Sequence, residues 1–215
     1  MKELLKKEAF FTAPKLTWIF LAFAVMALIP GYPILTGAFY ICFGLFQSYQ
    51  TAREANDILY TAMLPVKKTA VVRAKFAFAC LIEGIAFLLS SALTALRMTL
   101  LAHAAPYETN AMMNANVAFL GYMLLAFALF NLFFIGGFFK TAHKIGRPFL
   151  TYGIAVLLLV AVAETLHFLP GLTPLNATTF DPLQLVPFAV GAVAFPLLTV
   201  CAEKTAEKRF EKLDL

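Results

Sequence analysis

Long apolar segments recur from one end of the chain to the other and are separated by short polar stretches. Because lipid cannot satisfy backbone hydrogen bonds, such segments must form helices or a closed barrel. Barrel strands would alternate apolar and polar residues, and these segments do not. Only 13% of the residues are charged, against about 25% in a typical soluble domain. The sequence therefore predicts an all-α polytopic membrane protein.

Six transmembrane helices are predicted, within a single transmembrane domain that covers residues 1–215. Their expected ranges are 16–29, 34–49, 71–103, 116–139, 149–168 and 182–201. The first two are short for a hydrocarbon layer about 30 Å thick, so a hairpin that does not fully cross is the alternative to two crossings, which we favour. The third is roughly 50 Å long as a helix and should project from the membrane.

The basic residues predict the orientation. All but one of the 17 Lys and Arg residues fall on one side of the six-span topology, in segments 1–15, 50–75, 140–148 and 202–215. The loops on the other side contain none, and the exception is Arg97, inside the third span. Cytoplasmic loops are enriched in Lys and Arg, so both termini are predicted to be cytoplasmic. The net charge of +5 then reflects topology and contact with anionic membrane lipids, not nucleic-acid binding.

No motif for catalysis, cofactor binding or metal binding is found. The three histidines are far apart in sequence, and the three cysteines lie inside apolar runs without paired or metal-type spacing. The run Gly136-Gly137-Phe138-Phe139-Lys140-Thr141 lacks the glycine that precedes the lysine of a nucleotide-binding loop. We therefore expect no catalytic, cofactor or metal residues in this chain.

Four polar residues inside the predicted spans are candidate functional residues: Glu83, Arg97, Asn131 and Glu164. Charged groups in hydrocarbon usually face the protein interior or water. Glu83 and Arg97 share a helical face but lie about 21 Å apart, so they cannot pair. Arg97 and Glu164 have similar depths and are predicted to pair, and Asn131 lies near the depth of Glu83. These residues either line a translocation path or hold the helices together.

The longest polar interruption is residues 53–75, which contain five of the basic residues. Its first half, 52–64, is predicted to be an amphipathic helix that ends at Pro65, with Arg53, Asp57 and Thr61 on one face. The apolar face comprises Ile58, Leu59, Ala62 and Met63. The alternative is a solvated loop that anchors to anionic lipid. Residues 1–15 predict a short surface helix that ends near Pro14, or a frayed tail.

Residues 56–75 resemble the membrane subunits of ABC-2-type transporters, in particular the small bacterial permeases of that group. The sequence there is NDILYTAMLPVKKTAVVRAK. The resemblance rests on Glu54, Asp57, Tyr60, Leu64, Pro65, Val66, Lys67, Lys68 and Lys75.

The resemblance implies a permease subunit of an ATP-binding cassette exporter in the bacterial plasma membrane. In such permeases a coupling helix between spans 2 and 3 docks on a separate cytoplasmic ATPase, which binds the ATP and Mg, and two permease copies form a dimer, here expected to be a homodimer. The implied coupling residues are Arg53, Glu54, Asp57, Ile58, Leu59, Tyr60, Met63, Leu64, Pro65, Lys67 and Lys68. The loop between the last two spans is shorter than in larger relatives, which place re-entrant helices there. A membrane scaffold or immunity-type protein and a membrane-embedded lipid enzyme are the alternatives, and the substrate is open.

Overall fold

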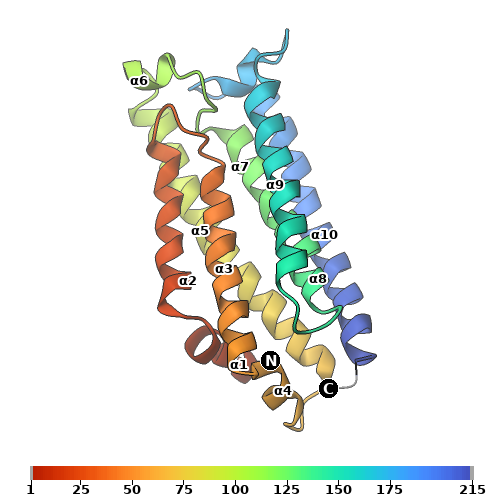
Figure 1. Ribbon diagram of the computed structural model, residues 1–215. Helices are drawn as coiled ribbons and strands as arrows, with labels where there is room; N and C mark the ends of the chain where they lie inside the picture. The colour runs from red at the N-terminus through yellow and green to blue at the C-terminus, as the bar shows by residue number, and fades with distance from the viewer. Residues whose placement is uncertain (1, 214–215) are drawn as a thin grey trace.

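The computed structural model describes residues 2–213, and within that range the chain forms helices and no strand. The long helices run side by side along one axis (Figure 1). In order, the elements are α1 (Lys2–Lys7), η1 (Glu8–Thr12), α2 (Lys15–Ile19), η2 (Phe20–Leu28), α3 (Thr36–Glu54), α4 (Asp57–Ala62), α5 (Lys68–Leu100), α6 (Ala105–Glu108), α7 (Val117–Leu129), η3 (Phe130–Ile135), α8 (Gly136–Phe138), α9 (Gly146–Leu166), η4 (Thr173–Asn176), η5 (Pro182–Gln184) and α10 (Leu185–Glu211). The all-α prediction is confirmed.

By length and composition, four helices within residues 2–213 can cross a membrane: Lys68–Leu100, Val117–Phe138, Gly146–Leu166 and Pro182–Glu211. A bent pair, Lys2–Thr12 with Lys15–Leu28, raises the number to five if the pair is counted as one span. α3 falls short because its second half, from Gln47 onward, is rich in polar residues. The protein is therefore a multi-pass membrane protein, while the sixth crossing stays a prediction.

The N-terminal segment forms a short helix that turns by 93° into the first apolar helix. The turn lies at Ala13 and Pro14, where the backbone is extended and the proline cannot donate a helical hydrogen bond. The predicted short helix before Pro14 is confirmed. Beyond the turn, η2 is a 3₁₀ helix, which rises more per residue than an α-helix, so α2 and η2 together reach about 25 Å. This stretching brings a 14-residue segment near the thickness of the hydrocarbon layer.

Aromatic side chains hold α3 against η3 and α9. Phe46 of α3 packs against Phe149 of α9 in a tilted arrangement with ring centroids 4.2 Å apart, and its ring also lies 5.5 Å from that of Phe134. Tyr49 meets Phe134 edge to face at 5.0 Å. Phe134 belongs to η3, a π-helical turn that interrupts the fourth apolar helix. The centre of the bundle is thus a packed aromatic core.

Helices α7 and α10 approach most closely at two glycines. A Cβ atom on Gly191 would overlap the backbone of Gly121, and one on Gly121 would overlap the backbone at Pro187. A side chain at either position would force the two helices apart.

Replacing Gly191 by alanine is therefore expected to lower the free energy of unfolding by about 1–3 kcal/mol, because the methyl group overpacks the crossing. Unfolding in mixed detergent micelles measures the change. The matched control is Gly153→Ala in α9, where no atom lies within 4 Å of the added methyl group. Equal effects of the two substitutions would contradict the close crossing.

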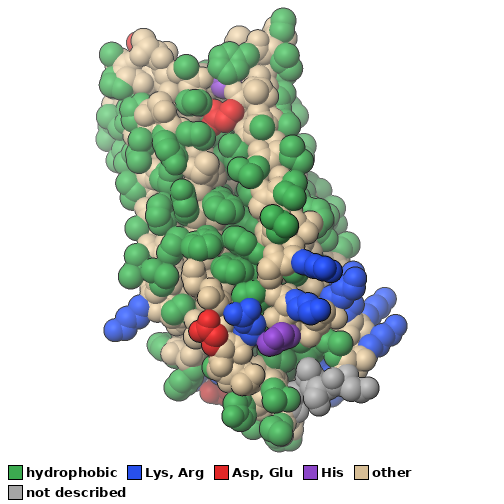
Figure 2. All heavy atoms as spheres, in the orientation of Figure 1, with side chains coloured by type: hydrophobic (Ala, Val, Ile, Leu, Met, Phe, Trp, Pro, Cys, Tyr) green, Lys and Arg blue, Asp and Glu red, His purple; other side chains and the backbone are tan. Residues whose placement is uncertain are grey.

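Both described ends of the chain lie at the same end of the bundle, close to α1 and α4 (Figure 1). On the face shown in Figure 2, the Lys and Arg side chains gather at that end, and the rest of the face is largely hydrophobic. This distribution agrees with the one-sided charge pattern of the sequence. We call this end of the bundle the basic end. We call the opposite end the asparagine end, after the asparagine contacts described below.

Candidate functional site

The predicted amphipathic helix over residues 52–64 is broken in two, so the prediction of one continuous helix is wrong. α3 continues to Glu54, and Asn56 then adopts a left-handed conformation with φ of 51° before α4 begins at Asp57. Asparagine tolerates this conformation better than most residues, which explains why the break falls here. The break turns α4 so that Asp57 and Thr61 face the protein.

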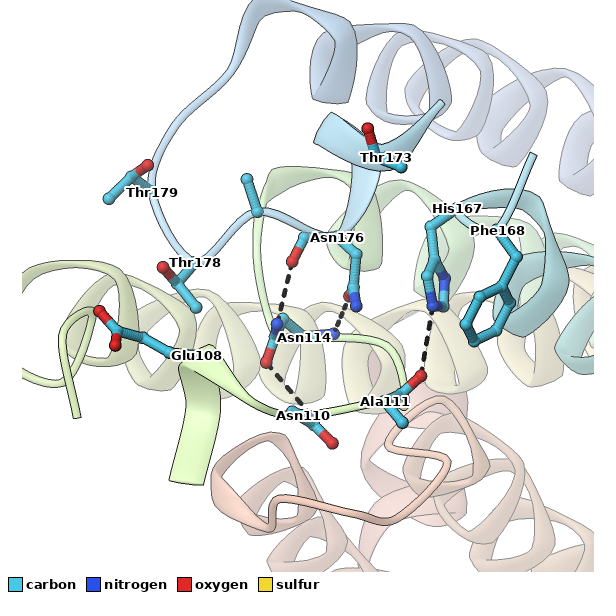
Figure 3. A pocket seen from close by; sticks show the side chains of 11 residues that line it. Glu108, Asn110, Ala111, Asn114, His167, Phe168, Thr173, Asn176, Thr178 and Thr179 are labelled. Carbon is cyan, nitrogen blue, oxygen red and sulfur yellow. Dashed lines mark hydrogen bonds between the residues drawn. The ribbon is translucent and has the colours of Figure 1, made fainter. Parts of the chain in front are cut away.

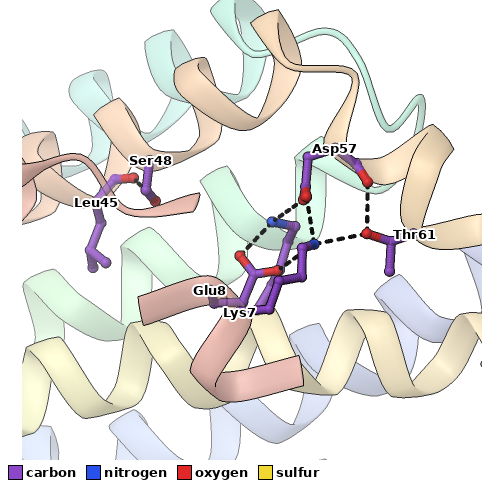
Figure 4. A network of polar contacts seen from close by, with 7 residues as sticks. Lys7, Glu8, Leu45, Ser48, Asp57 and Thr61 are labelled. Carbon is purple, nitrogen blue, oxygen red and sulfur yellow. Dashed lines mark hydrogen bonds and ion pairs between the residues drawn. The ribbon is translucent and has the colours of Figure 1, made fainter. Parts of the chain in front are cut away.

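A cluster of four charged groups, two of them buried and two partly buried, includes Asp57 from the polar side of α4 (Figure 4). Lys7 Nζ lies 2.5 Å from Asp57 Oδ1 and donates a 2.8 Å hydrogen bond to Thr61 Oγ1. Lys75 Nζ, on α5, lies 2.8 Å from Glu8 Oε2 and 3.5 Å from Asp57 Oδ2. Two lysines and two carboxylates make the cluster electrically neutral.

This cluster joins the N-terminal helix to α4 and α5, two consecutive helices that are distant from it in sequence. The side chain of Lys75 is only 2% exposed and that of Glu8 5%. The ammonium group of Lys75 also lies 5.3 Å from the centre of the Tyr49 ring on α3. Since a buried charge that loses its partner is costly, the four groups constrain where α4 can sit.

The opposite side of α4 is apolar and exposed. Tyr60 is 65% exposed and Met63 76%, and Leu59 and Leu64 are also exposed. Ile58 is buried at 6%, so the prediction that it shares this outer face is wrong: the helix is rotated toward the ion cluster. We call Leu59 and Tyr60 of α4, together with Met63 and Leu64 directly after it, the outer face of α4.

The remaining predicted coupling residues flank this outer face. Glu54, Pro65 and Lys67 are exposed, and Arg53 is half-buried. Lys68 donates a hydrogen bond to the carbonyl of Leu213. A cavity of about 200 Å³ lies beside α4, and its lining includes Arg53, Asn56, Leu59 and His143.

Midway along the bundle, Glu83, Asn131 and Thr199 form a buried polar contact. Asn131 Nδ2 donates to Glu83 Oε2 at 2.9 Å and to Thr199 Oγ1 at 3.0 Å. Glu83 and Asn131, predicted at similar depth, are therefore brought together, and Thr199 is an addition from α10. The contact ties α5 and α10 to the π-helical turn η3, a kind of element that is frequent at functional sites.

Arg97 and Glu164 do not form the predicted ion pair within residues 2–213. Arg97 Nη1 donates to the carbonyl of Ala27 at 2.8 Å, and Nη2 donates to Asn114 Oδ1 at 2.5 Å. Glu164 Oε2 instead accepts from the backbone N–H of Met113 at 2.7 Å. Groups from the end of η2 and from the loop before α7 satisfy these two side chains instead, because both side chains lie at the asparagine end of their helices.

Asparagine side chains close that end of the bundle (Figure 3). Asn114 donates through its backbone N–H to Asn176 Oδ1 at 2.6 Å, and its side-chain amide donates to the carbonyl of Asn176 at 2.9 Å. Asn116 donates to the carbonyl of Leu175 at 2.8 Å. These bonds connect the loop before α7 to the loop after α9, whose described residues form only 3₁₀ turns and no re-entrant helix. A cavity of about 480 Å³ lies there, lined by Glu108, His167 and Thr178 among others.

The comparison with protein families decides the class of this chain. A family model described as ABC-2 family transporter protein matches residues 3–201. The chain belongs to this family. The matched range contains α4, all four members of the ion cluster and the Glu83–Asn131–Thr199 contact. Neither the curated proteins nor the solved structures give a match.

Membership in a transporter family identifies this ABC-2 protein as a membrane permease and favours transport over the scaffold and lipid-enzyme alternatives. Members of the family generally work with a cytoplasmic ATPase. Over residues 2–213, the permease has no group of three or more His, Cys, Asp or Glu side chains placed to hold a metal ion.

Sequence reasoning missed several partners in this permease, namely Lys7, Glu8 and Lys75 at the basic end and Asn114 and Thr199 elsewhere. The sequence does carry a signal for Lys7 and Glu8, because these two charged residues interrupt the apolar face expected of a surface helix. No local pattern marks Asn114 or Thr199, whose partners come from other helices and loops.

Proposed function

We propose that this permease is the membrane subunit of an ATP-driven exporter and that α4 is its coupling helix. The observation that carries the proposal is the division of α4 into an exposed apolar face and a polar face locked to the ion cluster. Exposed apolar clusters on short surface helices mark protein-protein contacts. In this proposal the outer face of α4 docks on a separate cytoplasmic ATPase, which binds ATP and Mg.

The ion cluster would carry a displacement of α4 into the membrane helices. Asp57 of α4 pairs with Lys75 on α5, a helix of 33 residues and about 50 Å. On the same helix, Glu83 accepts from Asn131 of η3, which also donates to Thr199 of α10, and Arg97 donates to the Ala27 carbonyl and to Asn114. A push on α4 would therefore act on α5 as one rigid body and shift the contacts along its length.

The finer topology belongs to the same proposal. Six spans with both termini in the cytoplasm would place α4 and the ion cluster on the ATPase side. Two copies of this chain would form a homodimer in the bacterial plasma membrane, with Glu83, Asn131, Arg97 and Glu164 near the translocation path. The substrate class stays open among peptides, drugs, lipids and ions.

Co-purification from the native host tests the coupling proposal. The tagged wild-type chain is expected to recover an ATPase. The double variant Tyr60→Asp, Met63→Asp is expected to reduce the amount of ATPase recovered by about tenfold or more, because it places charges at the centre of an apolar contact. Both side chains are exposed, so the variant should keep the size-exclusion profile of the wild type.

The matched control is Tyr60→Phe, Met63→Leu, which keeps the outer face apolar and should retain the ATPase. Equal recovery with the Asp variant would move the docking site away from α4. Recovery of the wild-type chain without any ATPase, after gentle cross-linking as well, would overturn the proposal itself.

A further inference from the structure

A second cavity at the basic end is lined by cations that the coupling proposal does not use. It measures about 280 Å³ and lies between the end of the fourth apolar helix and the start of α9. Its lining includes Lys140, Lys144 and Arg147 together with the hydroxyl-bearing residues Thr141 and Thr151. Gly137 and Pro148 touch within this lining, where a methyl group on the glycine would lie 3.1 Å from the proline Cβ.

The charge of this cavity is one-sided. No acidic residue lines it, and Lys140, Lys144 and Arg147 form no ion pair with any group in the described range 2–213. Elsewhere at the same end, Lys75 and Arg73 are matched by carboxylates, with Arg73 Nε 2.6 Å from Glu207 Oε1. The Thr151 hydroxyl already donates to the carbonyl of Arg147 at 3.0 Å, whereas the Thr141 hydroxyl only accepts hydrogen bonds and can still donate one. Three cations and one free hydroxyl donor around one hollow suit a phosphate group.

The surface that continues from the cavity is apolar. Thr151 lines the cavity, and Leu150 and Ile154 of the same helix are exposed, as are Leu157 and Leu158 one turn further along. This face of α9 is left uncovered by the rest of the chain, and α9 is apolar enough to cross a membrane. A ligand with its phosphate in the cavity would lay any attached hydrocarbon chains along this face.

We propose that the cavity of Lys140, Lys144 and Arg147 binds the phosphate headgroup of an anionic phospholipid, whose acyl chains cover the exposed face of α9. Basic pockets between membrane helices on the cytoplasmic side are suited to such headgroups. The site shares no residue with the outer face of α4, since its lining comes from the end of the fourth apolar helix, the loop that follows it and the start of α9.

Native mass spectrometry of the full chain in mild detergent tests the site, with phosphatidylglycerol and phosphatidylcholine as probes. Phosphatidylglycerol is expected to bind about tenfold more tightly than phosphatidylcholine, and the triple variant Lys140→Gln, Lys144→Gln, Arg147→Gln is expected to lose that preference. The matched control removes three exposed cations from the last turns of α10 and its C-cap at the same end, Lys204→Gln, Lys208→Gln, Lys212→Gln, and should keep the preference.

A second variant, Thr151→Phe, partly fills the cavity without changing the charge and should also weaken phosphatidylglycerol binding. Equal loss of phosphatidylglycerol binding in the two triple variants would overturn the proposal, because charge anywhere at this end would then suffice. Unchanged binding in Thr151→Phe would also overturn it, because the lipid would then not occupy the cavity. Displacement of the lipid by millimolar inorganic phosphate would also overturn it and assign the cavity to a soluble phosphate compound.

Discussion

Replacing Lys75 by methionine is expected to lower the free energy of unfolding by about 3–5 kcal/mol, because Glu8 and Asp57 then share a buried site with one cation instead of two. Methionine keeps much of the side-chain volume, so the loss reports charge more than packing. Unfolding in mixed micelles can be followed by the fluorescence of Trp18, the single tryptophan of the chain. Its ring lies 6.3 Å from that of Phe78, one turn beyond Lys75 on α5.

Two further variants separate the cluster from a general loss of charge. Lys204→Met removes an exposed lysine at the same end of the bundle and is expected to change stability by about 0.5 kcal/mol or less. Adding Glu8→Gln to Lys75→Met restores neutrality and should recover part of the lost stability. A Lys75 variant as stable as the Lys204 control would show that the four charges do not fix α4 to α5.

The helices of this permease could be predicted from sequence because lipid imposes one simple rule. Each long apolar run has to satisfy its own backbone, and each of the longest forms a helix. The ends of the helices are harder to predict, because the helices continue past the apolar runs into polar sequence. α10 runs to Glu211, and in that region Glu207 pairs with Arg73 of α5, a contact between residues 134 positions apart.

A helix over Asp57–Ala62 lies within the predicted range 52–64, but the pattern of the segment does not say which of its faces meets the rest of the protein. Amphipathic reasoning assigns polar faces to water and apolar faces to protein. α4 does the reverse with Asp57 and Thr61, because Lys7 from the chain start and Lys75 from α5 supply the partners. Such partners are set by the fold and not by the spacing within the segment. The depth of Arg97 and Glu164 could likewise be predicted, but their partners are a backbone carbonyl at the end of η2 and groups of the loop before α7, which no periodicity marks.

The two accounts of Arg97 predict different energetic couplings. Replacing Arg97 by methionine is expected to lower the free energy of unfolding by about 2–4 kcal/mol, because the Ala27 carbonyl and Asn114 Oδ1 lose a buried donor. The guanidinium also leaves the Tyr107 ring, whose centre lies 4.2 Å away. Trp18 fluorescence in mixed micelles again provides the measurement.

A double-mutant cycle then identifies the partner. Arg97→Met and Asn114→Ala should be strongly non-additive, with a coupling of about 0.5–3 kcal/mol, because each removes the same hydrogen bond. Arg97→Met and Glu164→Gln should couple less, since Glu164 is bound to the backbone of Met113 and reaches Arg97 only through the neighbouring residue. A stronger coupling of Arg97 to Glu164 than to Asn114 would support the Arg97–Glu164 ion pair. The asparagine end would then have to rearrange in the membrane. The observed hydrogen bonds favour the stronger coupling to Asn114, because groups from η2 and the loop before α7 satisfy Arg97. Arg97 thus fixes the far end of α5, as the ion cluster fixes its start.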